Sequence, residues 1–221
     1  MHQLVKLLVE KHFTYYTREN HTTNALEDIF FVHPHSFTMW CAFPHVLMID
    51  ATYDTNMYKM AFVQVVGMTS TNQSFAVAHA FISAEKVDNY LWVLERIKSM
   101  LVDCMESRVI VTDRDFALMN ACDQIFPNAY KYLCRFHISQ NILKNSKEKF
   151  STTEWEEFIE SFWALCDSPT EDVYEYNLRN FEGHLKEIGR KSEYFLCKYI
   201  RTFFTDTPDK VCLYFQRLFS I

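Results

Sequence analysis

Three stretches in the first half of the chain have the residue pattern of β-strands. Residues 46–53, 60–68 and 74–82 are rich in apolar and β-branched residues and partly alternate with polar ones. Short polar links, around Asn56 and at 70–73, separate the three stretches. Strands joined by such short links pair antiparallel. The pattern therefore predicts three sequential antiparallel strands.

After residue 83 the apolar spacing predicts helices that alternate with strands. The predicted segments are a helix at 87–102, a strand at 108–113, a helix at 116–126, a strand at 129–134 and a helix at 136–150. Pro127 ends the second of these helices. The order β-β-β-α-β-α-β-α predicts an α/β fold with a mixed five-stranded sheet. That order matches the ribonuclease-H-like fold.

The two ends of the chain have helical spacing. At the N-terminal end we predict a helix within 1–20 and a short helix at 23–30, with Thr23 or Asn24 as its N-cap. Further predicted helices are at 153–166, at 169–185, at 194–204 and from Pro208 onward. The predicted organisation is a helical lead-in at 1–44, a domain at 45–185 and a C-terminal helical segment at 186–221. We expect a helical insertion at about 151–168 within the domain, and we expect the C-terminal segment to be truncated.

Composition narrows the possible functions. Only three glycines occur, which excludes a glycine-rich phosphate loop. The net charge of −6 excludes a protein that coats DNA by bulk attraction, so any DNA affinity needs local basic patches, metal ions or another domain. Seven scattered cysteines without a CxxC motif indicate a reducing compartment, either cytosol or nucleus. There is no signal-peptide pattern and no apolar run of membrane-spanning length.

Two aspartates lie where predicted buried strands end. Asp50 follows Val46–Ile49 and Asp113 follows Val109–Thr112. If the two strands are neighbours, the carboxylates converge and need a cation or a shared proton between them. The pair could then hold divalent ions for phosphodiester chemistry. The alternative is that each aspartate caps a turn or a following helix.

Other acids could join this pair. Asp54 lies four residues after Asp50, on the same face if the strand continues, and Asp115 fits the first turn of a helix. A third acid is expected on the helix that is opened by residues 166–171, CDSPTE. Glu171 fits first-turn helix chemistry, whereas Glu175 lies between two tyrosines inside the helix. A solvated helix face is the alternative for either glutamate.

Cys134 and His137 form a Cys-x-x-His motif after the last predicted strand. This motif can supply half of a zinc site, but the other half is not evident. The simpler interpretation is that Cys134 packs under the sheet and His137 makes a hydrogen bond near the acids. The basic residues Lys131, Arg135 and Lys144 are candidates for contacts to the DNA backbone.

Several strings resemble one known family. These are DATYDTNMY, GMTSTNQSF, VIVTDRDFALMNA and FPNAYKYLCRFHISQNI, preceded by FFVHPHS. Together they resemble the transposase domain of Mutator-like elements (MULEs) and the plant far-red-impaired-response regulators derived from such transposases. The resemblance covers roughly residues 25 to 185.

The resemblance implies a DDE-type catalytic site. The first two family acids fall on Asp50 and Asp113, the family's Cys-x-x-His falls on Cys134 and His137, and the third acid falls on Glu175. Val173 replaces an acid that is common in the family. If that acid is the true third member, Glu171 is the nearest substitute. Two Mg²⁺ or Mn²⁺ ions are the implied cofactors.

The implied function is DNA transposition in the nucleus, by metal-dependent cleavage and strand transfer at transposon ends. The implied partners are double-stranded DNA, at transposon ends and target, and further copies of the chain, with no membrane. Family members usually carry a separate zinc-binding DNA-recognition domain, which is absent from this sequence. The alternatives are a domesticated, non-catalytic transcription regulator or interaction module, and a decayed fragment of an element.

Overall fold

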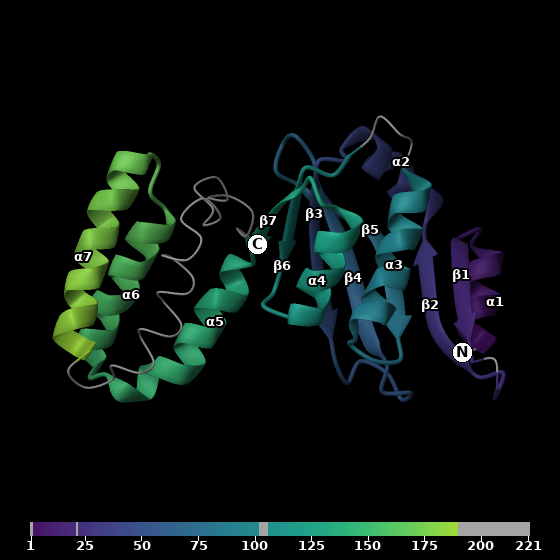
Figure 1. Ribbon diagram of the computed structural model, residues 1–221, viewed down its shortest axis with the longest axis horizontal. Helices are drawn as coiled ribbons and strands as arrows, with labels where there is room; N and C mark the ends of the chain where they lie inside the picture. The colour runs from purple at the N-terminus through teal and green to yellow at the C-terminus, as the bar shows by residue number, and fades with distance from the viewer. Residues whose placement is uncertain (1, 21, 102–105, 190–221) are drawn as a thin grey trace. The chain divides into compact units, whose positions relative to one another are not determined.

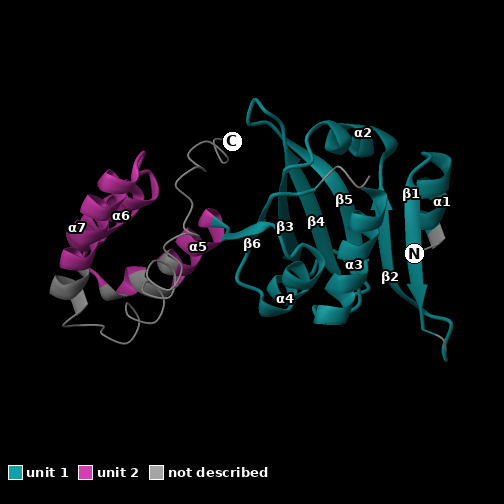
Figure 2. Cartoon of the chain, turned by 45° about the horizontal axis from the view of Figure 1, so that its top comes forward, with its two compact units in different colours: residues 1–134 teal, residues 135–221 magenta. Residues whose placement is uncertain are grey.

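The protein is described by a computed structural model, in which residues 2–20, 22–101 and 106–189 are described. The predicted helices at 194–204 and from Pro208 therefore lie outside the described residues. The chain divides into two compact units, Met1–Cys134 and Arg135–Ile221 (Figure 2). This division falls within the expected 45–185 domain, whose boundaries remain a prediction.

The first unit contains a mixed sheet and four helices among its described residues. Its elements are α1 (His2–Glu10), β1 (Thr14–Glu19), β2 (Leu26–Val32), α2 (Pro34–Ala42), β3 (Val46–Thr52), β4 (Ala61–Met68), β5 (Ser74–Ile82), α3 (Val87–Met100), β6 (Val109–Thr112), α4 (Phe116–Ile125) and β7 (Tyr130–Leu133) (Figure 1). The strand order is β1-β2-β5-β4-β3-β6-β7. The β3–β6 and β6–β7 pairs are parallel, and the other pairs are antiparallel.

All five predicted strands are present, and the helices predicted between them are confirmed. The expected count of five is wrong, because β1 and β2 extend the sheet to seven strands. The short helix predicted at 23–30 is also wrong, since Leu26–Val32 is the strand β2. The predicted 1–44 lead-in is therefore only partly helical. The assignment to the ribonuclease-H-like fold remains a prediction.

Residues of β2 alternate between the two faces of the sheet. Phe30 and Val32 join the main core beneath α3 and α4, which lie together on one face (Figure 1). Ile29 and Phe31 face the other way and pack with Leu8 of α1. This period of two follows from strand geometry, and it leaves β2 buried on both faces. Trp40 of α2 is 1% exposed and completes the main core.

The second unit is helical over its described residues. Its elements are α5 (Arg135–Ser146), the 3₁₀ turn Lys147–Lys149, α6 (Thr152–Cys166) and α7 (Glu171–Gly189). The side chains of Phe158, Phe162 and Phe181 are fully buried and join α6 to α7. The helices predicted at 136–150, 153–166 and 169–185 are confirmed with small shifts of their ends.

Candidate functional site

Asp50 and Asp113 lie side by side at one edge of the sheet. Strands β3 and β6 are parallel neighbours, and their register pairs Ile49 with Thr112. Each aspartate is the next residue after this pair. The predicted adjacency of the two strands is therefore confirmed, and both side chains are half-buried.

The alternative that Asp113 caps the following helix is wrong. Asp115 is the N-cap of α4, because its carboxylate accepts a hydrogen bond of 2.7 Å from the backbone N–H of Leu118. The Asp113 carboxylate instead accepts a hydrogen bond of 3.1 Å from the N–H of Asp115. Asp115 thus caps the helix, and Asp113 caps the turn that precedes it, so the turn-capping alternative is confirmed for Asp113.

Asp54 does not share the strand face of Asp50. Strand β3 ends at Thr52, and Asp54 lies in the exposed loop that follows, with a φ of 54°. Aspartate tolerates this left-handed conformation better than most residues do. Asp54 is therefore explained by the turn, and its expected position as a backup on the same strand face is wrong.

Glu85 is an acid of this edge that the sequence analysis missed. It lies in the loop between β5 and α3 and is half-buried. Burial, and after it the negative charges of Asp115, Asp113 and Asp50, raise the pKa of Glu85 to about 7, although a side-chain hydrogen bond with Tyr90 lowers it. The charges of three aspartates, from the end of β3 and from the loop between β6 and α4, therefore act on Glu85.

Tyr90 of α3 is a buried neighbour of Glu85. Its side chain is 1% exposed, and a hydrogen bond with it lowers the pKa of Glu85. Burial is the largest cause that raises the pKa of Tyr90, followed by the charges of Glu85, Asp115, Asp113 and Asp50.

The two candidates for the third acid, Glu171 and Glu175, lie on α7 in the second unit and are exposed. Glu171 is in the first turn of the helix, where a negative charge is favourable for the helix dipole. The expectation that Glu175, or Glu171 in its place, completes the site remains a prediction.

Cys134 and His137 fall in different units. Cys134 directly follows β7, and its backbone N–H donates a hydrogen bond of 2.6 Å to the carbonyl of Thr112. This bond continues the pairing of β6 with β7. Strand β6 ends at Thr112, directly before Asp113. His137 lies in the first turn of α5, with the ring of Phe136 5.6 Å away. The site-ordering roles of both residues remain predictions.

The structure contains no ready-made metal centre in its described part. Among residues 2–20, 22–101 and 106–189, no three His, Cys, Asp or Glu side chains are gathered closely enough to hold a metal ion. This also leaves the half zinc site of Cys134 and His137 without a second half in that part. The strand-end acids nevertheless supply the oxygen donors that Mg²⁺ and Mn²⁺ prefer.

Two of the three candidate DNA contacts already have partners within the protein. Lys131 forms an ion pair with Asp123, with an Nζ–Oδ1 distance of 3.2 Å. Arg135 binds Asp167 at 2.6 Å and lies 4.4 Å from the ring centre of Trp163. Lys144 is exposed near the end of α5. The predicted DNA contacts remain predictions, and the ion pairs make Lys144 the most accessible of the three.

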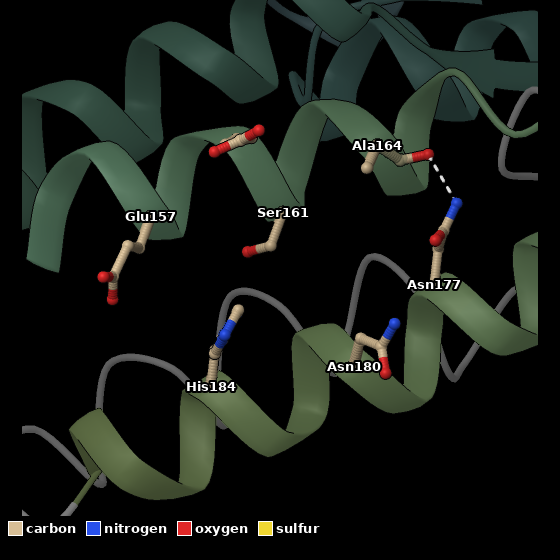
Figure 3. A pocket seen from close by; sticks show the side chains of 7 residues that line it. Glu157, Ser161, Ala164, Asn177, Asn180 and His184 are labelled. Atoms are coloured by element: carbon tan, nitrogen blue, oxygen red, sulfur yellow. Dashed lines mark hydrogen bonds between the residues drawn. The ribbon is translucent and has the colours of Figure 1, made fainter.

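A cavity of about 220 Å³ lies between α6 and α7 in the second unit (Figure 3). Its lining includes Glu157, Ser161 and His184, while Asn177 donates a hydrogen bond of 2.9 Å to the carbonyl of Ala164 at one end. The Ser161 hydroxyl donates a hydrogen bond of 2.8 Å to the carbonyl of Phe158 and not to a base. The cavity therefore has no evident chemistry of its own.

The fold and the acids define a class of protein: an α/β domain with carboxylates gathered at the strand ends of a mixed sheet. Residues 46–141 match the family described as the MULE transposase domain, which confirms the resemblance seen in the sequence. The match supports a transposase-derived protein, and it covers less than half of the chain.

The similarity to known proteins extends beyond residues 46–141. Protein FAR1-RELATED SEQUENCE 5 of Arabidopsis thaliana is 26% identical over 206 residues, which cover 87% of this chain and 25% of that protein. Protein FAR-RED IMPAIRED RESPONSE 1 of the same plant is 22% identical over 129 residues, or 58% of this chain and 15% of that protein. A PKS-NRPS hybrid synthetase, cheA, of Chaetomium globosum is 31% identical over 106 residues, or 47% of this chain and 2% of that protein. The chain thus spans at most a quarter of these relatives' length.

No helix in the described part of the chain is both long enough and apolar enough to cross a membrane.

Proposed function

We propose that this chain is the catalytic portion of a DNA transposase, which cleaves phosphodiester bonds at transposon ends and transfers the strand to a target. The observation that supports this most is the placement of Asp50 and Asp113 at the ends of the adjacent parallel strands β3 and β6. Both acids lie within the part of the chain that matches the MULE transposase domain.

The donor set fits the divalent ions that such a reaction uses. Asp50 and Asp113 offer carboxylate oxygens, and their negative charges contribute, after burial, to the raised pKa of Glu85. Asp50, Asp113 and Glu175, with Glu171 as the substitute, are the residues that we expect to hold Mg²⁺ or Mn²⁺. When bound, a pair of such ions activates water or a 3′-hydroxyl and stabilises the leaving oxygen.

The protein's own residues hold this edge in place. Parallel pairing of β3 with β6 fixes the spacing of the two aspartates, and the N–H of Asp115 orients the Asp113 carboxylate. The reaction needs no covalent protein intermediate, because water and then a DNA hydroxyl act as nucleophiles.

The proposal also covers the substrate, the oligomeric state and the cellular compartment. The substrate is double-stranded DNA, at transposon ends and at the target, and the protein acts in the nucleus as a homo-oligomer. The net charge of −6 indicates that most DNA affinity comes from a separate DNA-recognition domain.

A second candidate is a domesticated regulator that has the fold without the reaction. Two observations favour it. No three metal-ligating side chains are gathered in the described residues. In addition, the similarity to FAR1-RELATED SEQUENCE 5 covers 87% of the chain.

A plasmid-nicking assay separates the two candidates. The full chain is fused to a heterologous DNA-binding domain and incubated with supercoiled plasmid in MnCl₂. A transposase nicks the plasmid, and Asp50→Asn or Asp113→Asn lowers the rate by at least about 100-fold, since each removes a ligand of the catalytic ions. The matched control is Asp54→Asn, an exposed acid four residues from Asp50 that should keep the wild-type rate. Equal rates for all three variants, or no Mn²⁺ binding by calorimetry, would contradict a catalytic role.

A further inference from the structure

The loop that joins β3 to β4 carries exposed apolar side chains close to Asp50. Tyr53 is 62% exposed, Met57 is 86% exposed, and Tyr58 is exposed as well. Strand β3 ends at Thr52, so this loop leaves the sheet at the edge where Asp50 lies. Single exposed apolar residues are ordinary, but three within six positions of one loop indicate a surface that contacts a partner.

Hydrogen bonds from Asn56 fix the shape of this loop. The Asn56 amide donates a bond of 2.6 Å to the carbonyl of Met60. Its oxygen accepts bonds from the backbone N–H groups of Tyr58 at 3.1 Å and of Met60 at 3.2 Å. Asp54 and Lys59 have positive φ angles of 54° and 53°, a conformation that is costly for residues with a Cβ atom. A loop held in a costly shape while its apolar side chains stay exposed is typical of a preorganised binding surface.

A second exposed ring lies close to Asp113. Phe116 is the first residue of α4, three positions after Asp113, and is 65% exposed. The guanidinium of Arg114 lies 5.5 Å from the centre of this ring. Because β3 and β6 are parallel neighbours, the loops that carry Tyr53 and Phe116 leave the same edge of the sheet. Exposed aromatic rings, one of them beside an arginine, therefore flank the two aspartates.

This combination suits unpaired nucleobases of DNA. Every base has a π face that stacks on an aromatic ring, and an adjacent arginine adds positive charge near the phosphate. A base inside a duplex is covered by its neighbours, so it stacks on a protein ring only when it is turned out of the duplex. The net charge of −6 disfavours DNA binding by bulk attraction, and stacking supplies affinity that does not depend on net charge.

We propose that Tyr53 and Phe116 stack on unpaired nucleobases of DNA next to the bond to be cleaved, and that Arg114 contributes positive charge beside the phosphate. This inference rests on the proposed function, in which the phosphate that reacts lies at Asp50 and Asp113. It specifies the substrate of that reaction, because the DNA is unpaired at the reacting position and paired further away.

The test compares two DNA probes that bind the full chain at low ionic strength in MnCl₂. One probe is a blunt duplex, and the other is the same duplex with a short single-stranded overhang that contains 2-aminopurine, whose fluorescence falls when the base stacks. We expect wild type to quench this fluorescence and to bind the overhang probe about tenfold more tightly than the blunt duplex.

The two rings should contribute separately to this preference. Tyr53→Leu and Phe116→Leu should each lower it by about threefold or more, because leucine keeps an apolar side chain but removes the ring. Tyr53→Phe and Phe116→Tyr keep the ring and should bind as wild type does, which separates stacking from a merely structural role. Because both side chains are exposed, all four variants should melt as wild type does.

Tyr130→Leu is the matched control. Tyr130 is 68% exposed and begins β7, which is parallel to β6, so it lies at the opposite edge of the sheet. This variant should keep the wild-type preference. Equal binding of both probes by wild type, or an unchanged preference in both Tyr53→Leu and Phe116→Leu, overturns the inference. Weaker self-association of these two variants in sedimentation, with unchanged probe binding, also overturns it and assigns the rings to an interface between copies of the chain.

The plasmid-nicking assay tests the proposed function separately, because stacking requires no cleavage. If wild type nicks the plasmid but does not prefer the overhang probe, this inference fails and the proposed function stands. If the preference depends on the two rings but wild type does not nick the plasmid, the stacking surface stands and the transposase reaction fails.

Discussion

The side-chain amide of Asn89 donates hydrogen bonds to both carboxylate oxygens of Asp28, at 3.1 and 3.2 Å. These residues lie 61 positions apart in the chain, on α3 and β2. Arg18 of β1 forms an ion pair with the same carboxylate. A single buried acid therefore joins the outer strands of the sheet, the helix α3 and the loop that carries Glu85.

Replacing Asp28 with alanine should cost about 3–5 kcal/mol in the free energy of unfolding. The substitution removes the carboxylate that accepts a hydrogen bond from the Ser83 N–H, and it leaves the amide of Asn89 and the guanidinium of Arg18 without their buried partner. Chemical denaturation of the full chain measures this cost. The matched control is Asp123→Ala, which breaks the exposed ion pair with Lys131 and should cost less than about 1 kcal/mol. Similar costs for the two variants would show that Asp28 does not join these elements.

Gly67 is required by a close contact between two strands. A Cβ atom at this position of β4 would lie 2.5 Å from the ring of Phe75, which is paired with Gly67 on β5. We expect Gly67→Ala to destabilise the protein by about 1–3 kcal/mol, because the ring must move within a packed layer. The additional change Phe75→Leu should recover part of that loss, and denaturation midpoints test both statements.

For Gly183 we expect no destabilisation on substitution by alanine, so it serves as the control for Gly67→Ala. It lies exposed in α7, and a Cβ atom there would meet nothing within 4 Å. Gly183→Ala should therefore leave stability unchanged or raise it by up to about 1 kcal/mol, since alanine favours the helix. Destabilisation by both substitutions would show that helix α7 is not formed as described.

The sequence predicted the central five strands well because their apolar runs are continuous and turn residues separate them. It failed at Leu26–Val32, where Asp28 interrupts an apolar run that would otherwise be evident as a strand. The partners that make a buried aspartate tolerable, Arg18, Ser83 and Asn89, are distant in sequence. Threonine and tyrosine in Thr14–Glu19 were a usable strand signal, since these residues favour strands.

The candidate site was also only partly predictable, because some of its residues are distant from one another in the sequence. Asp50 and Asp113 were predictable because each ends an apolar run, and this placement is visible locally. Glu85 follows β5 by three residues, in a polar loop that has the composition of an ordinary helix start. Its relation to the aspartates depends on β5 and β3 running in the same direction two strands apart. Strand direction was implicit in the predicted antiparallel order, so comparing all strand ends at one edge would have found it.

Helix α6 begins with a capping box. The backbone N–H of Glu154 donates to the hydroxyl of Ser151, and the Glu154 carboxylate accepts from the N–H of Ser151 at 2.9 Å. Ser151→Ala should cost about 1 kcal/mol, which corresponds to roughly fivefold faster hydrogen exchange of the amides in α6. Thr153→Ala, an exposed neighbour outside the box, should exchange as wild type does. Unchanged exchange in Ser151→Ala would mean that the box contributes nothing to the start of the helix.

The raised pKa of Glu85 should make stability depend on pH in metal-free buffer. Burial and the neighbouring acids raise this pKa from 4.5 to about 7 in the folded protein. Between these values the folded state keeps a proton that the unfolded chain has lost, so the free energy of unfolding falls as pH rises through the window. Because the side chain is partly exposed, solvent screening limits the effect to about 1 kcal/mol or less.

Glu85→Gln lacks the titrating group, and the buried His79, whose pKa is lowered by burial, titrates equally in both proteins. Denaturation in EDTA between pH 4.5 and 8 should therefore show wild type losing stability relative to Glu85→Gln as pH rises. Parallel curves, or a gap that widens toward acid pH, would contradict the arrangement of acids at this edge of the sheet.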